Sequence, residues 1–348
     1  MSFSSRDNGA LTRGKPRVAI ATGDPAGIGP EIALKAALDP SVRTACNPIL
    51  VGDADIIESH AGLCGLRIKL RAVARIGDAE WSDDRINVLN CVQPDGAGIP
   101  LGAVSAAAGR ASIAFCAAAV KAALAGEVDA VVAAPQNETS IAQAGIPFDG
   151  HPSFVARQTG TDENDVYMML CFGSTMIAHC TLHQSVRDAI GAITRERVTR
   201  VIRVTDQTLR SLGIDNPKLC VSGLNPHAGE GGLFGREEIE IIRPAIEAAA
   251  ADGLSVEGPF GADTMFHRTG VDAFIVMLHD QGHIAAKLLA PNAAVALTIG
   301  TPILFASIAH GSAHDIAGKG VASPAAMIEA VLRMSTAPRC GRRAAAAE

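Results

Sequence analysis

Residues 17–31 read RVAIATGDPAGIGPE, and this stretch decides the fold class. The apolar run Arg17–Thr22 is typical of a buried strand, and the glycine- and proline-rich loop after it leads into a helix predicted over Pro30–Leu38. Pro30 suits the first turn of that helix because its missing N–H would have no partner there, and Glu31 suits the positive end of the helix dipole. A strand that passes directly into a helix is the unit of a parallel α/β sheet.

The same alternation of short apolar runs and longer helical patterns continues to the end of the chain. Pro244 predicts a kink or split in one helix, and a polar cluster at Pro135–Gly150 predicts a crossover between two parts of the molecule. Further strands are predicted at Ile49–Val51, Asp129–Ala134, Val166–Leu170, Met176–Leu182, Leu219–Leu224, Phe274–Leu278, Ala296–Ile299 and Ile303–Ile308. Further helices are predicted at Ala103–Ala125, Gln184–Leu212, Arg236–Ala251 and Ser323–Met334.

This pattern predicts a two-lobed, three-layer α/β/α protein with no internal repeat and no low-complexity linker. The first lobe is discontinuous and comprises residues 15–136 and 300–338, and the second lobe comprises residues 137–299. The chain therefore crosses twice between the lobes.

The composition excludes several classes of protein. The 348 residues include 30 Lys and Arg against 36 Asp and Glu, a formal net charge of −6, with 48% apolar and only 3% aromatic residues. The apolar share is too high for a disordered chain. A mild acidic excess with few aromatic residues argues against a groove for nucleic acid. We expect a soluble globular protein of about two domains whose ligand is a small molecule.

The start of the chain, MSFSSRDNGALTRGKPR, is polar and lacks the apolar core of a signal peptide. No run of eighteen apolar residues occurs. The eight cysteines form no CxxC pair, which is typical of free thiols in a reducing compartment. We therefore expect a cytoplasmic protein without a membrane partner.

Three of the ten histidines share one context, because each follows an apolar strand. His183 follows MIAHCTL, His227 follows LCVSGLNP, and His279 follows FIVML. Ligands of open α/β sheets bind beyond the carboxyl ends of the strands, and three imidazoles would leave an open position on a divalent cation, as catalysis requires. A single histidine at a strand end is more often a hydrogen-bonded loop residue. The agreement of three contexts nevertheless predicts a metal site.

The segment His279–His283 reads HDQGH and superficially resembles a helical HxxxH zinc pair. Gly282 and the preceding strand predict a loop instead, and Asp280 stands where the HExxH motif has its glutamate base. His179 lies within a predicted strand, so we expect a core residue with its hydrogen bonds satisfied.

Two loops are rich in glycine. A tight strand-to-helix turn explains the glycines of Gly23–Glu31, which match neither GxGxxG nor a P-loop, and leaves Asp24 without a role. The loop Asn225–Gly232 contains more glycine than packing requires. Gly229 and Gly231 are therefore predicted to let the backbone approach a ligand closely.

Four motifs together resemble the 4-hydroxythreonine-4-phosphate dehydrogenase family: GDPAGIGPE, GLNPHAGEGG, MLHDQGH with Lys287, and HGSAHDIAGKG. The resemblance extends from about Arg17 to Met334. It implies a fold like that of isocitrate and isopropylmalate dehydrogenases, a homodimer, and NAD-dependent oxidation of a secondary alcohol coupled to decarboxylation.

The resemblance also implies that a divalent metal is held by His183, His227 and His279, one of them supplied across the dimer interface, so that the active site is shared. The second lobe then contains both the metal site and the interface. Three imidazoles suit zinc, which we favour, but iron, cobalt, nickel or magnesium remain open.

Departures from the family pattern bear on the substrate. Members that act on phosphorylated substrates hold the phosphate with an Asn, an Arg and the lysine matching Lys287, whereas this chain has Ala296 and Phe305 at the first two positions. Each charge-assisted hydrogen bond is worth roughly 1.5–3 kcal/mol, so losing both side chains would weaken phosphate binding by several kcal/mol. The family histidine next to the substrate is matched by His151, but its threonine neighbour is replaced by Pro152.

The segments PQNETSIAQAGI, TLHQSVRDAI and LHDQGHIAAKLLAPN are similar to terephthalate dihydrodiol dehydrogenases, the branch that acts on cis-dihydrodiols of aromatic dicarboxylates. This similarity implies conversion of terephthalate dihydrodiol to protocatechuate, CO2 and NADH. Lys287 and Asp263 are the candidate catalytic residues, with Lys287 binding a carboxylate or delivering a proton. The candidate substrate-binding residues are His151, Lys287, Ala296 and Phe305.

NAD is expected at the late loop His310–Gly320 and beside Ala296–Gly300, not on a Rossmann fingerprint. The candidate cofactor-binding residues are Gly229, Gly231, Thr298, Gly300, His310, Gly311 and Asp315.

Three alternatives remain open from the sequence. The first is a dehydrogenase of 4-hydroxythreonine 4-phosphate or a related phosphorylated hydroxy acid. The second is a metal-dependent hydrolase with a three-histidine site, which would produce no NADH. The third is a two-lobed binding protein without catalysis.

Overall fold

The computed structural model describes residues 14–93, 98–290 and 294–336. Cys340 and the last two residues of the predicted first lobe, 337 and 338, lie outside the described residues. Seven cysteines lie inside this part, and all seven are free thiols.

The strands form one twelve-stranded sheet in the order β3-β4-β2-β1-β5-β12-β11-β6-β7-β10-β8-β9. The pairs β12–β11, β11–β6 and β6–β7 are antiparallel, and all other pairs are parallel. The strands are β1 (Arg17–Ala21), β2 (Asn47–Gly52), β3 (Leu70–Val73), β4 (Ile86–Asn90), β5 (Ala130–Ala133), β6 (Tyr167–Phe172), β7 (Thr175–His179), β8 (Lys218–Ser222), β9 (Ser255–Phe260), β10 (Ala273–Val276), β11 (Val295–Ile299) and β12 (Phe305–Ile308).

Helices cover both faces of this sheet, so the predicted α/β/α layering is confirmed. Along β1 the side chains alternate, with Val18 and Ile20 in one buried cluster and Ala19 and Ala21 in another on the opposite face. The helices are α1 (Gly29–Leu38), α2 (Pro40–Ala45), α3 (Ala54–Leu63), α4 (Ala106–Leu124), α5 (Glu138–Gln143), α6 (His151–Thr159), α7 (Val186–Ala192), α8 (Arg195–Ser211), α9 (Arg243–Ala251), α10 (His279–Leu289) and α11 (Ala325–Ser335).

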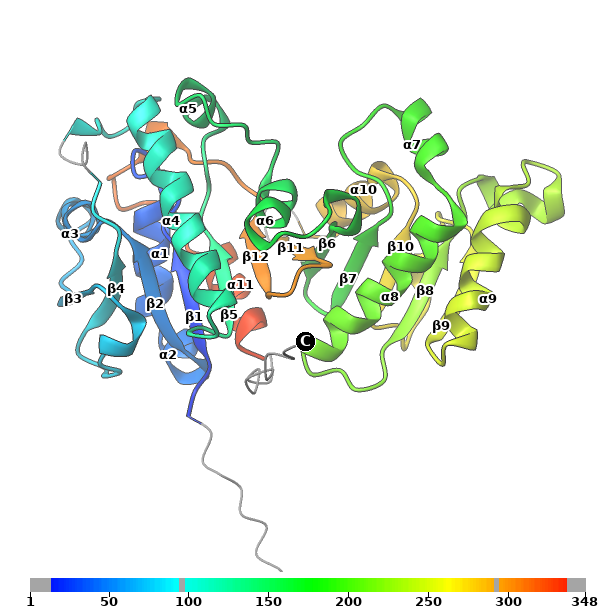
Figure 1. The fold of residues 1–348 in the computed structure, drawn as a ribbon, viewed down its shortest axis with the longest axis horizontal. Helices are drawn as coiled ribbons and strands as arrows, with labels where there is room; N and C mark the ends of the chain where they lie inside the picture. Colours follow the sequence, from blue (N-terminus) through cyan, green and yellow to red (C-terminus); the bar gives the residue numbers. More distant parts are fainter. Residues whose placement is uncertain (1–13, 94–97, 291–293, 337–348) are drawn as a thin grey trace, which may run out of the picture.

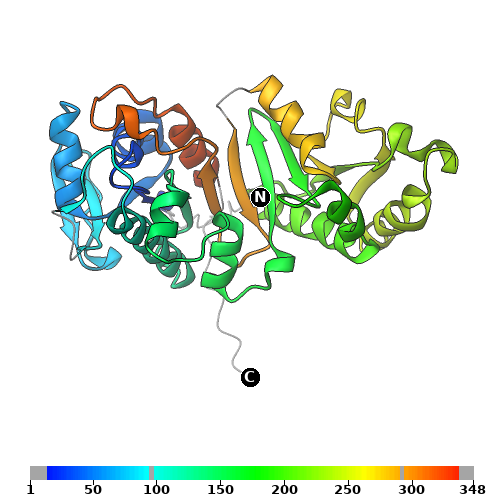
Figure 2. The same cartoon turned by 90° about the horizontal axis from the view of Figure 1, so that it is seen from above.

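Figure 1 shows how the chain divides between the two ends of the sheet. The N-terminal elements β1–β5 form the left half, β6–β10 form the right half, and β12 and α11 return to the left. Seen from above in Figure 2, the orange segment of β11 and β12 lies in the middle of the molecule. The sheet is therefore mixed at its centre, because β11 runs antiparallel to both of its neighbours. The division into lobes at residues 136 and 300 stays a prediction.

Two local predictions were wrong. The helix predicted over Gln184–Leu212 is broken into α7 and α8, since Ile193 has an extended backbone (ψ 95°) and the Thr194 side chain caps α8 by accepting from the Arg197 N–H. The loop predicted at HDQGH is the start of α10. There the Gln281 side chain accepts from the N–H groups of Met277 and Leu278 and so secures the helix start.

Helix α4 is long and apolar enough to cross a membrane by length and composition. Half of its apolar window is buried inside the protein, however, and Ala108, Phe115 and Ala119 are fully buried. This burial is typical of a core helix packed on a sheet.

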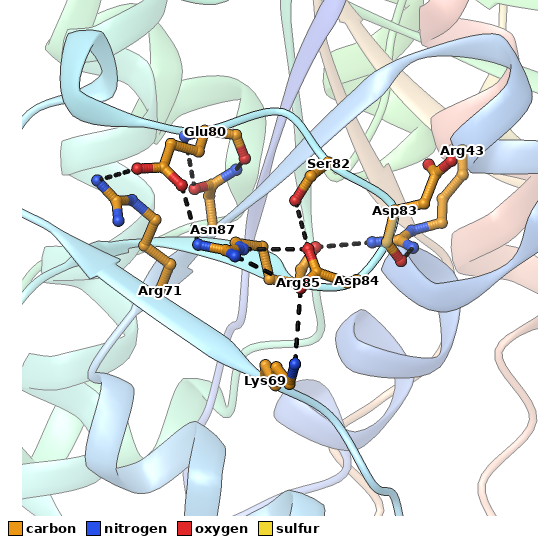
Figure 3. Close-up of polar contacts among 9 residues, drawn as sticks. All are labelled: Arg43, Lys69, Arg71, Glu80, Ser82, Asp83, Asp84, Arg85 and Asn87. Carbon is orange, nitrogen blue, oxygen red and sulfur yellow. Dashed lines mark hydrogen bonds and ion pairs between the residues drawn. The ribbon is translucent and has the colours of Figure 1, made fainter.

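The edge of the sheet at β3 and β4 is lined with ion pairs (Figure 3). Glu80 pairs with Arg71 and Arg85 at 2.9 Å each, and Asp84 pairs with Lys69 at 3.6 Å and with Arg85 at 3.1 Å. Charged side chains on an edge strand discourage pairing with other chains. A surface cavity of about 630 Å³ lies beside this edge. It adjoins none of the strand ends that bear the predicted metal ligands, so we do not place the substrate there.

Candidate active site

Two of the predicted metal ligands meet at the carboxyl ends of β7 and β10. These strands are parallel neighbours, so the loop after β7 brings the exposed His183 beside His279, the first residue of α10. The two ring centroids lie 5.6 Å apart. Nδ1 of His279 lies 2.7 Å from Oδ1 of Asp280. A metal-binding histidine typically donates its second ring N–H to such a carboxylate, which leaves Nε2 for the cation.

His283 continues this cluster one turn further along α10. Its ring stacks on that of His279, with centroids 3.6 Å apart and planes within 11°, and its Nδ1 lies 3.1 Å from the His279 carbonyl oxygen. Burial, together with the nearby His279, lowers the pKa of His283 to about 4. Residues four apart bring their rings together in this way because the segment is helical.

His179 is fully buried beneath this pair, and its ring centroid lies 4.8 Å from that of His283. The prediction of satisfied hydrogen bonds was wrong for Nε2, which has no partner among the residues that the structure describes. Burial lowers the pKa of His179 to about 3, so the ring is neutral. A Cβ at Gly282 would lie 2.4 Å from this Nε2, which explains a glycine inside α10.

The third predicted ligand, His227, lies in a loop of unusual backbone conformation. The five consecutive residues His227–Gly231 all have positive φ, including 52° at His227, 51° at Ala228 and 43° at Glu230. Left-handed conformations at non-glycine residues are costly and are often found at functional sites. The imidazole is exposed, with Nδ1 3.5 Å from a Glu230 carboxylate oxygen. Gly231 lies open, as the ligand-approach prediction requires, whereas Gly229 is needed for packing against Glu238.

The single chain therefore brings His183 and His279 together without completing a metal site. Among the described residues, no three His, Cys, Asp or Glu side chains converge as a cation would require. The residue types and the His279–Asp280 pair nevertheless fit a divalent metal.

Four predicted substrate and cofactor residues lie on one face around β11 and β12. Thr298 pairs directly with Phe305, and Ala296 lies two residues from Thr298 on the same face. His151, at the start of α6, packs on Phe305 with ring centroids 5.5 Å apart. Phe305 is 1% exposed, and burial lowers the pKa of His151 to about 4. The His151 Nε2 has no hydrogen-bond partner in the described part of the chain.

The late loop after β12 folds onto the loop after β1. Oδ2 of the fully buried Asp24 lies 2.8 Å from Nε2 of His314, and the Ile28 N–H donates to the Ser312 carbonyl. A Cβ at Gly27 would lie 2.5 Å from the same carbonyl oxygen. Asp24, which had no role in the sequence analysis, thus joins residues 290 positions apart. Its position directly after a strand was the one available signal.

A second buried contact holds the end of the late loop. Glu31 is fully buried and accepts from the Ala322 N–H at 2.9 Å, and from Lys35 at 2.7 Å. Lys35 also donates to the carbonyls of Gly320 and Ala322. Together these contacts fix the loop that was predicted to bind NAD.

The remaining predicted residues lie apart from these contacts. Gly300 (φ 93°) approaches the Asp165 carbonyl so closely that a Cβ would lie 2.1 Å from it, which gives this glycine a structural reason. Gly311 and Asp315 lie exposed in the late loop, and Nδ1 of His310 lies 3.2 Å from the Gly311 carbonyl oxygen. Lys287 is exposed on α10, and Asp263 is exposed between β9 and β10.

Comparison with known proteins identifies the family. A family model described as pyridoxal phosphate biosynthetic protein PdxA matches residues 44–334. The chain belongs to the PdxA family. It is 39% identical over 328 residues to 1,2-dihydroxy-3,5-cyclohexadiene-1,4-dicarboxylate dehydrogenase of Comamonas sp, covering 92% of this chain and 98% of that protein. It is 41% identical to a putative D-threonate 4-phosphate dehydrogenase of Cutibacterium acnes, covering 91% and 92%.

Solved structures of PdxA-family proteins share the fold. The crystal structure of a 4-hydroxythreonine-4-phosphate dehydrogenase from Burkholderia phymatum matches with a TM-score of 0.85 and 37% identity, covering 94% of this chain and all of that one. These PdxA relatives are dehydrogenases, so this chain is an oxidoreductase. The alternative of a binding protein without catalysis is thereby excluded.

Proposed function

We propose that the protein oxidises and decarboxylates a cis-dihydrodiol of an aromatic dicarboxylate with NAD, converting terephthalate dihydrodiol to protocatechuate, CO2 and NADH. One observation carries the choice of substrate. Phe305 stands where the resemblance places a phosphate-binding arginine, and its buried ring packs on His151. A phenyl ring donates nothing to a phosphate, whereas it suits a face beside a carbocyclic substrate.

The rival substrate is a phosphorylated hydroxy acid. It is supported by the 41% identity to the putative D-threonate 4-phosphate dehydrogenase. Lys287 would serve either substrate, since an ammonium group binds carboxylate and phosphate alike. A hydrolase has no support among the relatives named above, which are dehydrogenases.

The reaction balances as a two-electron oxidation. A hydride passes from the secondary carbinol carbon to NAD, and the hydroxyl proton leaves to a base. The resulting ketone lies β to a carboxylate, so the electrons of the breaking C–C bond move into an enolate as CO2 departs. Aromatisation then drives the step forward. A divalent metal held by His183, His227 and His279, with zinc favoured, would lower the pKa of the diol and stabilise the enolate charge.

The chain's own residues take the other roles. Asp280 orients His279. Lys287, exposed on the same helix, is the candidate for binding a substrate carboxylate or delivering a proton, and Asp263 and His151 are proposed to line the substrate pocket. The neutral His151 places an uncharged ring beside Phe305.

We further propose a homodimer in which a partner supplies the missing metal ligand. The geometry favours His183 and His279 from one chain and His227 from the other, since only the first two rings adjoin. Exposed apolar side chains around the histidines support an interface here. They are Val186, Ile190, Leu233, Phe234, Ile284, Leu288 and Leu289.

NAD is proposed at the late loop His310–Gly320 and beside Thr298 and Gly300, with Gly229 and Gly231 as further candidate cofactor-binding residues. The buried contacts at Asp24 and Glu31 would hold that loop ready for the cofactor. The lobes 15–136 with 300–338, and 137–299, would then meet at the active site. A cytoplasmic location remains part of the proposal.

The deciding experiment is a steady-state assay of the purified protein with NAD and either terephthalate dihydrodiol or D-threonate 4-phosphate, followed by NADH absorbance. We expect turnover of the dihydrodiol and a kcat/KM for the phosphate ester lower by at least about a hundredfold, the cost of two lost charge-assisted hydrogen bonds. A higher kcat/KM for the phosphate ester than for the dihydrodiol would overturn the proposed substrate assignment.

The shared site has its own test. His227→Ala and His279→Ala are expected to be inactive separately, while a mixture refolded together should regain activity, because half of the dimers contain one intact site if the two ligands come from different chains. No recovery in a confirmed mixed dimer would place both histidines in one chain. The double variant His227→Ala/His279→Ala mixed with His183→Ala is the matched control that should stay inactive.

A further inference from the structure

The loop that presents His227 is held by a single buried carboxylate. Glu238, at the start of the π-helical turn Glu238–Ile242, is 2% exposed. Its Oε1 accepts from the backbone N–H groups of Leu224 and Asn225, both at 2.7 Å, and its Oε2 accepts from the Asn225 side-chain amide at 2.9 Å. All three donors belong to the segment that leads into His227.

The same carboxylate accounts for two glycines of the GLNPHAGEGG motif. A Cβ at Gly229 would lie 2.6 Å from Oε2 of Glu238, and a Cβ at Gly223 would lie 3.0 Å from Oε1 and 2.8 Å from the Ala228 Cα. The loop therefore closes around the Glu238 side chain. Glycine there serves this close packing as well as the positive φ of 79° at Gly229.

The loop is strained and needs such a support. His227, Ala228 and Glu230 all hold left-handed conformations, which side-chain-bearing residues adopt only where their surroundings impose them. The contacts of His227 with the described residues are weak: its exposed ring lies 3.5 Å from Glu230 and 6.0 Å from Phe234 between centroids. The orientation of His227 thus depends on the backbone, whose buried support is Glu238, while Glu237 accepts a further hydrogen bond from the Asn225 side chain at 2.7 Å.

We propose that Glu238 is a positioning residue for the metal site, which fixes the left-handed loop so that His227 is presented to the cation. This inference rests on the proposed function for the identity of His227 as a ligand. Glu238 itself touches neither metal nor substrate in this proposal. It acts as the supports of metal ligands commonly do, through the geometry of the ligand and not its charge.

The test is titration of the full-length protein with Zn²⁺ in competition with a chromophoric chelator. Glu238→Ala should weaken zinc binding by about tenfold or more, the range measured for supports of metal ligands. Glu238→Gln keeps one oxygen for the two backbone donors and should lie between wild type and Glu238→Ala. Glu240→Gln is the matched control, because Glu240 lies on the same turn, is exposed, and pairs with Arg236 on the surface.

Amide hydrogen exchange of the zinc-free protein provides a second readout that needs no metal. The Leu224 and Asn225 amides should exchange faster in Glu238→Ala than in wild type or Glu240→Gln, with circular dichroism unchanged. If Glu238→Ala does not fold, Glu238→Gln decides. Wild-type zinc affinity in a folded Glu238 variant with loosened amides would overturn the positioning role alone. Failure of the wild-type protein to bind zinc would instead overturn the proposed metal site.

Discussion

The two halves of the sheet hold their functional loops in different ways. In the left half, the loop after β12 is bound to the loop after β1 and to α1 through the buried Asp24 and Glu31 and the partly buried Lys35. In the right half, the loops after β7, β8 and β10 present histidines that are exposed or adjoin one another, as His183 and His279 do. In the left half, Asp24 and Oε1 of Glu31 find their partners within the chain, whereas Oε2 of Glu31 has none among the described residues. In the function proposed above, the right half would receive its missing groups from a metal and a second copy.

This difference indicates a division of labour. A cofactor loop that is already fixed loses little entropy when its ligand binds. A metal site divided between chains instead joins catalysis to assembly, because the site forms only when the subunits meet. The four predictions below test the two halves and the face between them, beginning with the largest expected effect.

Lys35→Met tests the left-half contact most severely. It leaves the Glu31 carboxylate buried without its cation, so we expect the free energy of unfolding at pH 7 to fall by roughly 3 kcal/mol in urea denaturation. Lys69→Met removes the exposed pair with Asp84 and should leave the free energy of unfolding nearly unchanged. An equally small effect of Lys35→Met would show that the late loop is not fixed by this pair.

The same contact predicts a pH dependence. Burial alone would raise the pKa of Glu31, but hydrogen bonds from Lys35 and from the Ala322 N–H outweigh it and hold the pKa below the ordinary glutamate value. The stabilisation is therefore present at a pH above the ordinary glutamate pKa of the unfolded chain. It is lost as the pH falls through the lowered pKa of Glu31 in the folded protein. The difference in the free energy of unfolding between wild type and Lys35→Met, measured by urea denaturation, should become smaller over that acidic range.

Gly282→Ala tests the right half. Helix propensity alone predicts a gain of up to about 1 kcal/mol, but the new Cβ would lie 2.4 Å from Nε2 of the fully buried His179. We expect destabilisation of roughly 1–3 kcal/mol by thermal or urea unfolding. The control is Gly191→Ala in α7, where a Cβ meets nothing within 4 Å and stability should rise. A gain in both variants would mean that His179 can move aside.

His151→Gln tests the face between the halves and has the smallest expected effect. The folded protein keeps His151 neutral down to a pKa of about 4, whereas the unfolded chain takes up the proton near the ordinary pKa of about 6.5. Stability therefore rises with pH between about 4 and 6.5, by at most about 1.4 kcal/mol per pH unit for this proton. His151→Gln should reduce that slope, while exposed His267→Gln should not. Equal slopes for all three proteins would contradict a buried neutral His151.

Much of the architecture could be predicted because it depends on local sequence. The apolar run of β1, the start of α1 at Gly29 and the split near Pro244 follow from residues within a few positions of each other. The positions of His183 and His279 directly after predicted strands also follow from local sequence, and the two rings do lie together. The break at Ile193 and the helix at HDQGH were missed, because one depends on a cap and the other on a glycine tolerated beside His179.

The sequence by itself therefore determined the alternating α/β elements, the strand-end placement of the histidines and the family motifs, all of which depend on spacing along the chain. Only the tertiary structure decided what Asp24, Glu31 and Glu238 do. Apart from Lys35, which is four residues from Glu31, the partners described here lie 13 to 291 residues away along the chain. Burial is the physical reason: a carboxylate removed from water must find donors wherever the fold places them, and those donors are fixed only when the whole sheet has formed.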